Sequence, residues 1–254
     1  MPHTHGRFAW HRLNTADPAA AAAFYPRVTP WSAQPWDVAD DYTLWMNAGR
    51  PVGGAVSLTD EFSALGLGSH WLPYVSVYDV DDCARQAVKL GARLRTGPAE
   101  IPNVGCWAVL SDPQGAAFGV YEPDRPRVPE PVPAVGEFSW HELATTDYKS
   151  AFDFYRALFK WEQLDEYDMG EMGIYFMFGL AGQMFGGMFS NRPGPAPRWL
   201  SYVRVDDVAN AAKRVAEAGG SVANGPMEVP NGAWIAQCVD GQGAQFAVQT
   251  LAPE

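Results

Sequence analysis

The sequence predicts an α+β protein made of two tandem domains, each built from two βαβββ units. Three observations predict this fold class. The chain repeats itself at a separation of about 130 residues. Segments with strand-like and helix-like periodicity follow one another in the same order in both copies, and a proline-rich stretch separates the copies.

The repeat is clearest where the two copies begin. The first copy reads FAWHRLNTADPAAAAAFY from Phe8, and the second reads FSWHELATTDYKSAFDFY from Phe138. Matches continue through each half, which indicates duplication of one domain. Between the copies, prolines favour an extended linker. We therefore predict a first domain over residues 1–122, a linker over 123–136 and a second domain over 137–254.

Each copy opens with a predicted strand and helix. The run RFAWHRLNT reads as a strand, after which Asp17 supplies a carboxylate that caps a helix and Pro18 suits the first helical position. Pro26 and Pro30 predict that this first helix ends early. Strand-like runs follow, which are YTLWMNA and PVGGAVSL in the first copy and GIYFMFGLA and QMFGGMFS in the second.

The second unit of each copy repeats this order. In the first copy LPYVSV reads as a strand and DVDDCARQAVKLGA as a capped helix that ends near Gly91. CWAVLSD and AAFGVYEP then read as two strands joined by the turn SDPQG. The second copy gives LSYVRV, DVANAAKRVAEAGG, WIAQCVD and AQFAVQT in the same order. The chain is thus predicted to contain four βαβββ units.

Composition excludes several classes of protein. The 254 residues carry a formal net charge of −11 without a basic cluster, so we expect no nucleic-acid partner. The longest apolar windows are interrupted by Gly and Gln, and no basic segment precedes an apolar one at the N-terminus. We therefore expect no membrane span and a cytoplasmic location. Three irregularly spaced cysteines fit neither a disulfide framework nor a zinc site. As a separate expectation, the protein is a monomer or a homodimer.

These motifs resemble the vicinal oxygen chelate (VOC) superfamily, which includes glyoxalase I, extradiol dioxygenases, fosfomycin-inactivating enzymes and bleomycin resistance proteins. The resemblance is carried by the AAFY ending of the first helix, the DVDD and DVAN helix starts and the hairpin motif DPQGAAF. Within the superfamily the chain is most similar to tandem two-domain glyoxalase-like proteins. The resemblance implies that two βαβββ units form a half-open, eight-stranded cup with helices on its outer face and a site on its concave face.

The resemblance also implies where a metal ion would be bound, by His, Gln and Glu side chains on the first and last strands of the units. The corresponding positions are occupied by residues without suitable donor atoms, namely Trp10, Leu72, Gly119, Trp140, Leu200 and Ala247. A divalent cation requires several converging donors. We therefore expect no metal and no other cofactor, with one divalent ion at an unforeseen site as the alternative.

His11 and His141 follow the first-strand ligand position by one residue, and strand alternation places such a residue on the opposite face. We expect each histidine to pack between sheet and helix with one ring nitrogen bonded to the backbone. A catalytic or substrate-binding role, or metal binding through a bulge, is the alternative. The residues that would then face the cup are Trp10, Arg12, Trp140 and Glu142.

Opposite charges distinguish the two predicted sites. Arg12 in one copy and Glu142 in the other would select ligands of opposite charge. The alternative is that both charges are solvated and that the tryptophans belong to the core. The last strands add further candidate binding residues, which are Gly119, Tyr121, Gln245, Ala247 and Gln249.

Two functional hypotheses follow. The first is a metal-independent small-molecule binding protein of the glyoxalase and bleomycin resistance type, in which an aromatic cup buries the ligand and Arg12 or Glu142 fixes its polar end. The second is an enzyme, a glyoxalase-like lyase or isomerase or a dioxygenase-type enzyme. Such an enzyme would use Glu142 as general base or a metal site that the sequence does not reveal.

Overall fold

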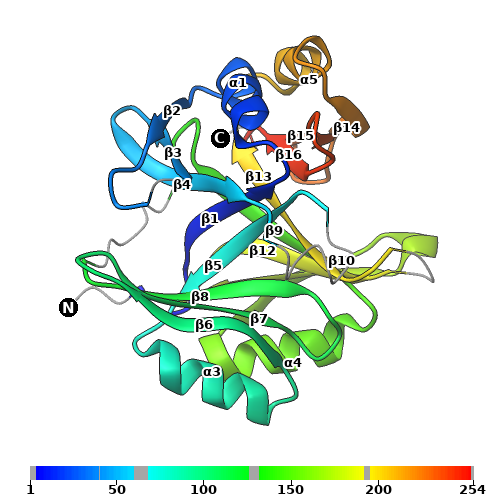
Figure 1. The fold of residues 1–254 in the computed structure, drawn as a ribbon. Coiled ribbons are helices and arrows are strands. Elements are labelled where there is room, and N and C mark those ends of the chain that lie inside the picture. Colours follow the sequence, from blue (N-terminus) through cyan, green and yellow to red (C-terminus); the bar gives the residue numbers. More distant parts are fainter. Residues whose placement is uncertain (1–3, 40, 60–67, 126–131, 192–194, 253–254) are drawn as a thin grey trace. The chain divides into compact units, whose positions relative to one another are not determined.

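The two halves of the sequence contain the same succession of strands and helices (Figure 1). The computed structural model describes residues 4–39, 41–59, 68–125, 132–191 and 195–252. The first half contains β1 (Phe8–Thr15), α1 (Pro18–Val28), β2 (Ser32–Pro35), β3 (Tyr42–Asn47), β4 (Arg50–Ser57), β5 (His70–Ser76), α3 (Val80–Lys89), β6 (Arg93–Ile101), β7 (Gly105–Ser111) and β8 (Ala117–Pro123). The second half contains β9 (Phe138–Thr145), α4 (Tyr148–Phe159), β10 (Glu162–Asp168), the short 3₁₀ helix η1 (Gly170–Met172), β11 (Ile174–Leu180), β12 (Gln183–Ser190), β13 (Arg198–Arg204), α5 (Val208–Glu217), β14 (Ser221–Glu228), β15 (Trp234–Val239) and β16 (Gln245–Gln249).

The strands form two sheets of eight, one from each half of the sequence. The first has the order β2-β3-β4-β1-β5-β8-β7-β6, and the second has the order β10-β11-β12-β9-β13-β16-β15-β14. Neither sheet closes into a barrel, because the strands at its two ends do not pair with each other. The predicted α+β class and the four βαβββ units are confirmed. Of the predicted linker 123–136, residues 126–131 lie outside the described residues, and the exact domain boundaries stay a prediction.

The chain folds as two compact units, and neither unit coincides with one half of the sequence. Unit 1 consists of residues 1–10, 72–131 and 140–199, and unit 2 consists of residues 11–71, 132–139 and 200–254. Unit 1 contains helices α3 and α4, and unit 2 contains α1 and α5. Each unit therefore combines a helix-bearing segment of the first half with one of the second.

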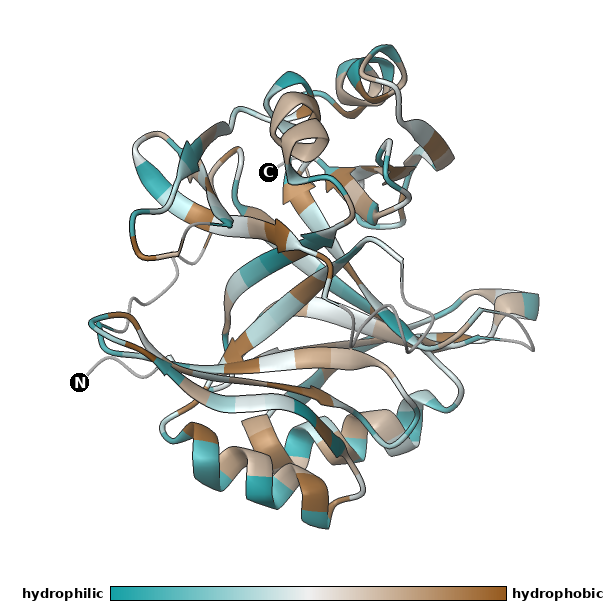
Figure 2. Ribbon diagram, in the orientation of Figure 1, coloured by the Kyte–Doolittle hydropathy of each residue, from teal (hydrophilic) through white to brown (hydrophobic). Residues whose placement is uncertain are grey.

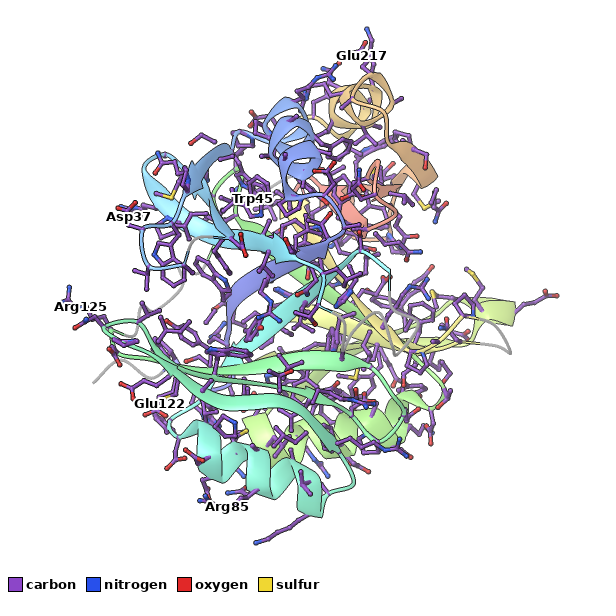
Figure 3. The ribbon with its side chains drawn as sticks, in the orientation of Figure 1. Asp37, Trp45, Arg85, Glu122, Arg125 and Glu217 are labelled. Atoms are coloured by element: carbon purple, nitrogen blue, oxygen red, sulfur yellow. The ribbon has the colours of Figure 1, made fainter. Side chains whose placement is uncertain are left out.

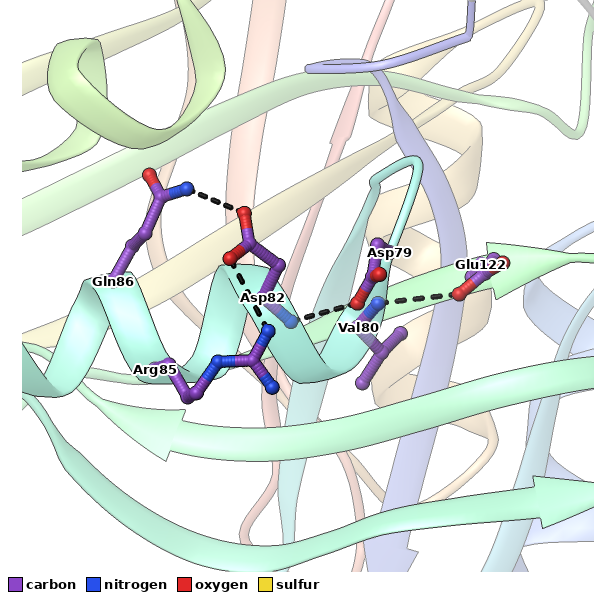
Figure 4. Close-up of polar contacts among 6 residues, drawn as sticks. All are labelled: Asp79, Val80, Asp82, Arg85, Gln86 and Glu122. Atoms are coloured by element: carbon purple, nitrogen blue, oxygen red, sulfur yellow. Dashed lines mark hydrogen bonds and ion pairs between the residues drawn. The ribbon is translucent and has the colours of Figure 1, made fainter.

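Helices α1, α3, α4 and α5 begin at the expected capping aspartates, which are Asp17, Asp79, Asp147 and Asp207. Figure 4 shows this for α3, where the Asp79 carboxylate accepts a hydrogen bond from Asp82 N at 2.7 Å. At the same helix end, Val80 N donates a hydrogen bond to the Glu122 carboxylate at 3.2 Å. One turn further along, the Arg85 guanidinium donates a hydrogen bond to the Asp82 carboxylate. Each side-chain cap stabilises a helix by about 1 kcal/mol. Hydrophilic and hydrophobic residues alternate along the turns of α3, as expected for a helix that packs on a sheet (Figure 2).

Helix α1 ends before Pro30, as the sequence predicts, but Pro26 does not terminate it. The helix runs to Val28 and is capped by Thr29. Pro26 lies in the last turn, where its ring costs only one backbone hydrogen bond. Both the backbone N–H and the hydroxyl of Thr29 donate to Tyr25 O at 2.9 Å, so this carbonyl is fully used at the helix end.

The core of unit 1 joins the helix of one half to the sheet of the other. The ring of Phe118 on β8 contacts the aromatic rings of Phe154, Tyr155 and Phe159 on α4. These residues are almost completely buried. Because Phe118 belongs to the first half and α4 to the second, this aromatic cluster holds the two halves together.

A buried chain of hydrogen bonds runs through this core. Trp199 Nε1 donates to the hydroxyl of Tyr155 at 3.1 Å, and that hydroxyl donates to Asp112 Oδ2 at 3.0 Å. Asp112 Oδ1 accepts from the backbone N–H groups of Gln114 and Ala116, both at 2.9 Å, in the predicted turn between β7 and β8. We call Trp199, Tyr155 and Asp112 the Trp–Tyr–Asp chain of unit 1.

Unit 2 contains the same arrangement with the halves exchanged. Trp71 Nε1 donates to Tyr25 OH at 2.8 Å, and Tyr25 OH donates to Asp240 Oδ2 at 2.8 Å. Phe246 on β16 packs against Tyr25, as does Trp45 on β3, which is labelled in Figure 3 and has no exposed surface. Here the tyrosine comes from the first half and the aspartate from the second. No helix within the described ranges is both long and apolar enough to cross a membrane.

Candidate functional site

His141 faces the core, as strand alternation predicts. Its side chain is 4% exposed, its Nδ1 donates to Phe185 O at 3.2 Å, and its ring stacks on Phe8 at 3.6 Å between centroids. Burial lowers the pKa of His141 to about 3, against the opposing effect of the hydrogen bond to Phe185. The expected packing role is confirmed for His141. In unit 2 His11 is equally buried and stacks on Phe138 at 3.6 Å.

The residues on either side of His141 are brought together on the opposite face of β9. Trp140 Nε1 donates to Tyr175 OH at 2.9 Å, and Tyr175 OH donates to Glu142 Oε2 at 3.0 Å. All three side chains are half-buried. The hydroxyl thus connects an indole to a carboxylate and fixes the position of Glu142. The sequence predicts Glu142 as a site residue but does not identify Tyr175 as its partner.

Gly187 on β12 makes this arrangement possible. It is the register partner of Glu142, and the ring of Tyr175 lies directly over it. A Cβ at position 187 would overlap the ring and the hydroxyl of Tyr175. The glycine therefore provides the space through which Tyr175 reaches the carboxylate.

Other apolar side chains continue this face across the neighbouring strands. Phe189 stacks on Tyr175 with 6.2 Å between ring centroids. Met177 is the register partner of Gly187, and Tyr167 is that of Tyr175, so both lie on the same face. We call Trp140, Glu142, Met177, Tyr175 and Phe189 the Glu142 face. It offers half-buried aromatic surface around one fixed carboxylate, a combination typical of small-molecule sites.

On β8 the predicted binding residues Gly119 and Tyr121 lie on one face. Tyr74 is the register partner of Gly119, and its ring covers that glycine so closely that a Cβ there would overlap it. Tyr121 donates its hydroxyl to Val104 O at 2.9 Å. The position at which the resemblance would place a metal-binding glutamate is therefore filled by an aromatic ring.

On β16 the predicted residues differ in exposure. Gln245 is exposed, whereas Ala247 and Gln249 are buried. The amide of Gln249 donates to Ser139 Oγ at 2.8 Å. Ala247 is the register partner of both Tyr202 and Gln237, and Gln237 Nε2 donates to Tyr202 OH at 3.0 Å.

The residues present do not fit a divalent metal ion at the family's ligand positions. Indole and aliphatic side chains stand there in both halves, and the Tyr74 ring leaves no room for a longer side chain at position 119. Within the described residues, no three His, Cys, Asp or Glu side chains are grouped so that they could hold a metal. We therefore derive no chemical step through a metal.

A hollow of about 520 Å³ in unit 1 lies away from the Glu142 face, between α4 and strands β10 and β11. Its lining includes the aromatic residues Tyr148, Phe152 and Phe176 and the charged residue Arg156. Arg156 pairs with Asp153 at 3.0 Å, and both are well exposed. We favour the Glu142 face as the site, because this hollow lacks a buried polar group that could orient a ligand.

In the first half, Trp10 and Arg12 are half-buried on β1 and lie on either side of the buried His11. Arg12 is the register partner of Gly54, and the ring of Tyr42 lies over this glycine. Arg12, Gly54 and Tyr42 thus occupy the positions that Glu142, Gly187 and Tyr175 occupy in the second half. The sequence predicted the exchange of charge, but it did not identify either tyrosine.

Comparison with known proteins agrees with the fold. The family model of the Glyoxalase/Bleomycin resistance protein/Dioxygenase superfamily matches residues 137–248, and the glyoxalase-like domain model matches residues 11–121. The chain belongs to this superfamily. It is the family that the sequence motifs predicted, and both halves are members.

Relatives of similar length align with almost the whole chain. "Putative glyoxylase CFP32" of Mycobacterium tuberculosis is 29% identical over 249 residues, which cover 96% of this chain and 95% of that protein. "Anthracycline biosynthesis protein DnrV" of Streptomyces peucetius is 28% identical over 264 residues, which cover 97% and 94%.

Two solved structures of the superfamily show the same fold. The Mn(II)-bound glyoxalase from Novosphingobium aromaticivorans has a TM-score of 0.68 at 16% identity and covers 99% of this chain and 84% of its own. An extradiol ring-cleaving dioxygenase from B. fuscum has a TM-score of 0.68 at 12% identity and covers 97% and 72%. At these identities the likeness concerns the fold and not the reaction.

Proposed function

We propose that the protein is a metal-independent small-molecule binding protein that takes a planar aromatic ligand on the Glu142 face. The observation that carries this proposal is the hydrogen-bonded series Trp140, Tyr175 and Glu142, with Phe189 stacked beside it. Aromatic surface binds a flat apolar body, and a fixed carboxylate selects a ligand with an amine or another hydrogen-bond donor.

Two further points support this ligand class. The net charge of −11 favours the approach of a cationic molecule over an anionic one. DnrV and a second relative, DauV of Streptomyces sp., are named as anthracycline biosynthesis proteins, and anthracyclines are flat aromatic molecules that commonly carry an amino sugar. A polycyclic aromatic molecule that carries an aliphatic amine therefore satisfies both the aromatic surface and the carboxylate.

Fluorescence titration with daunorubicin, a planar amine, tests the proposal. Wild-type protein should bind it, and Glu142→Gln should weaken the affinity at least tenfold, which corresponds to about 1.4 kcal/mol. Asp153→Asn is the matched control, because it also removes a carboxylate from unit 1 but at an exposed position. Failure of the wild-type protein to bind, or equal affinity of Glu142→Gln and wild type, would overturn the proposal.

A second candidate function is a glyoxalase-like lyase or isomerase, or a dioxygenase-type enzyme. It is favoured by the hydrogen bond of 3.0 Å from Tyr175 OH to Glu142 Oε2, which holds the carboxylate in one place as a general base requires. Loss of turnover in Glu142→Gln with ligand affinity retained would select this candidate. Equal turnover in wild type and variant would exclude Glu142 as the base.

A further inference from the structure

A polar cluster in unit 2 lies outside the Glu142 face and was not identified from the sequence. Arg12 and Asn14 are two residues apart on β1 and so share a face. Asn14 Nδ2 lies 3.3 Å from Nε2 of His70, the first residue of β5. The segment before His70 is held in place because Ala16 N donates to Ser69 Oγ at 3.1 Å.

The hydrogen bonds of His70 determine which way the Asn14 amide points. Nδ1 of His70 lies 2.8 Å from Gly68 O, and a carbonyl only accepts, so this nitrogen carries the proton. Burial, and to a lesser extent the charge of Arg12, lower the pKa of His70, so the ring is neutral and Nε2 is an acceptor at neutral pH. Asn14 therefore turns its NH₂ group toward His70 and its Oδ1 away from it.

This orientation leaves a buried acceptor. Asn14 has no exposed surface, and in the part of the chain that the structure describes its Oδ1 has no hydrogen-bond partner. Leaving such an atom unsatisfied destabilises the folded protein, because its hydrogen bond to water is lost without replacement. The fold itself does not require the amide, because the equivalent position of the second half is Ala144 in a strand of the same kind.

We propose that Arg12, Asn14 and His70 form a second binding site, in the first half of the sequence, for a small organic anion that carries a hydroxyl group beside its charged oxygen. The Arg12 guanidinium binds the anionic oxygen, Asn14 Oδ1 accepts from the neighbouring hydroxyl, and His70 orients the amide. The Tyr42 ring over Gly54 provides a flat surface next to Arg12 for the body of the ligand.

The second half has replaced every polar member of this cluster. Glu142, Ala144 and Arg198 stand at the positions of Arg12, Asn14 and His70. The site therefore goes beyond the proposed function at Glu142, because it binds a ligand of opposite charge through different residues. The chain contains two copies of one strand arrangement, and only the first carries this set of residues.

Calorimetric titration with 2-hydroxybenzoate and with benzoate tests the inference. The wild-type protein should bind 2-hydroxybenzoate at least fivefold more tightly than benzoate, because only the former carries the neighbouring hydroxyl. Asn14→Ala should bring the ratio of the two Kd values close to one. His70→Ala should reduce the same ratio. A purely structural role of Asn14 or His70 would leave the ratio unchanged and would overturn the assignment.

Arg12→Gln is an independent variant, because Arg12 is only half-buried and its loss leaves the core intact. It should weaken both ligands at least tenfold. Arg85→Gln removes the same charge from the exposed side of α3 and serves as control (Figure 4). Equal binding of both ligands by wild-type protein, or unchanged binding by Arg12→Gln, would overturn the inference. Daunorubicin binding at Glu142 is measured in a separate titration. The anion site at Arg12 can therefore be refuted while the Glu142 site is supported, and the reverse.

Discussion

Mild acid should destabilise the protein through His141. The ring is almost completely buried, and its pKa in the folded protein is about 3, whereas the ordinary value is 6.5. As the pH falls below 6.5, the imidazole of His141 becomes protonated in the unfolded protein but stays neutral in the folded protein. Stability is therefore fully present above pH 6.5 and is lost as the pH falls toward 3.

The size of this effect follows from the two values. Each pH unit in this window changes the free energy of unfolding by about 1.4 kcal/mol, so His141 alone removes about 2 kcal/mol between pH 6.5 and pH 5. Most exposed carboxylates are still ionised at pH 5, which separates the effect of the histidine from theirs.

Urea denaturation of wild type and His141→Gln at pH 7 and pH 5 measures the effect. The glutamine amide can still donate to Phe185 O, but it cannot take up a proton. The loss of stability between the two pH values should be about 2 kcal/mol smaller in the variant. His5→Gln is a graded control, because His5 is half-buried and its pKa is also lowered by burial. Equal losses in wild type and His141→Gln would refute the reasoning.

Four further predictions concern the buried groups and metal independence. Tyr155→Phe leaves Asp112 and Trp199 without their hydrogen-bond partner. Urea denaturation should therefore show a free energy of unfolding lower by about 2–4 kcal/mol than in wild type, and a decrease below about 0.5 kcal/mol would contradict this. Burial raises the pKa of Tyr155 well above its ordinary value of 10, so stability should fall as the pH rises above 10, and less steeply in this variant. Cys83 and Cys238, whose pKa values burial raises to about 12, should resist iodoacetamide at pH 8 in the folded protein, and rapid labelling detected by mass spectrometry would contradict this. Dialysis against EDTA should change neither Tm nor daunorubicin affinity, and a loss of either would reveal a required metal.

The elements with strong local signals could be predicted from the sequence. Capping aspartates such as Asp147, the turn at Asp112 and the repeat itself were all read correctly, because each depends on residues close together in the chain. Strands β2, β6, β10 and β14 were not located, although the βαβββ pattern implied them. All four lie at a sheet edge and contain no buried residue, so they lack the alternation that identifies a half-buried strand.

The candidate site was predictable only as far as strand alternation reaches. Alternation placed His141 and Glu142 on opposite faces without any knowledge of their neighbours. It could not show that Tyr175 reaches Glu142, because that contact depends on the glycine at position 187 of a different strand. The orientation of Asn14 likewise follows from His70, which is distant in the sequence.

The buried Trp–Tyr–Asp hydrogen-bond series occurs once in each unit, through Tyr155 in unit 1 and Tyr25 in unit 2, and this bears on how the protein evolved. Each takes its tyrosine from one half and its aspartate from the other, so a single ancestral half would have buried these groups only against a second copy of itself. In the present protein both copies belong to one polypeptide, so a substitution at position 12 does not appear at position 142. The two copies can therefore change independently, and one gene can carry two different specificities.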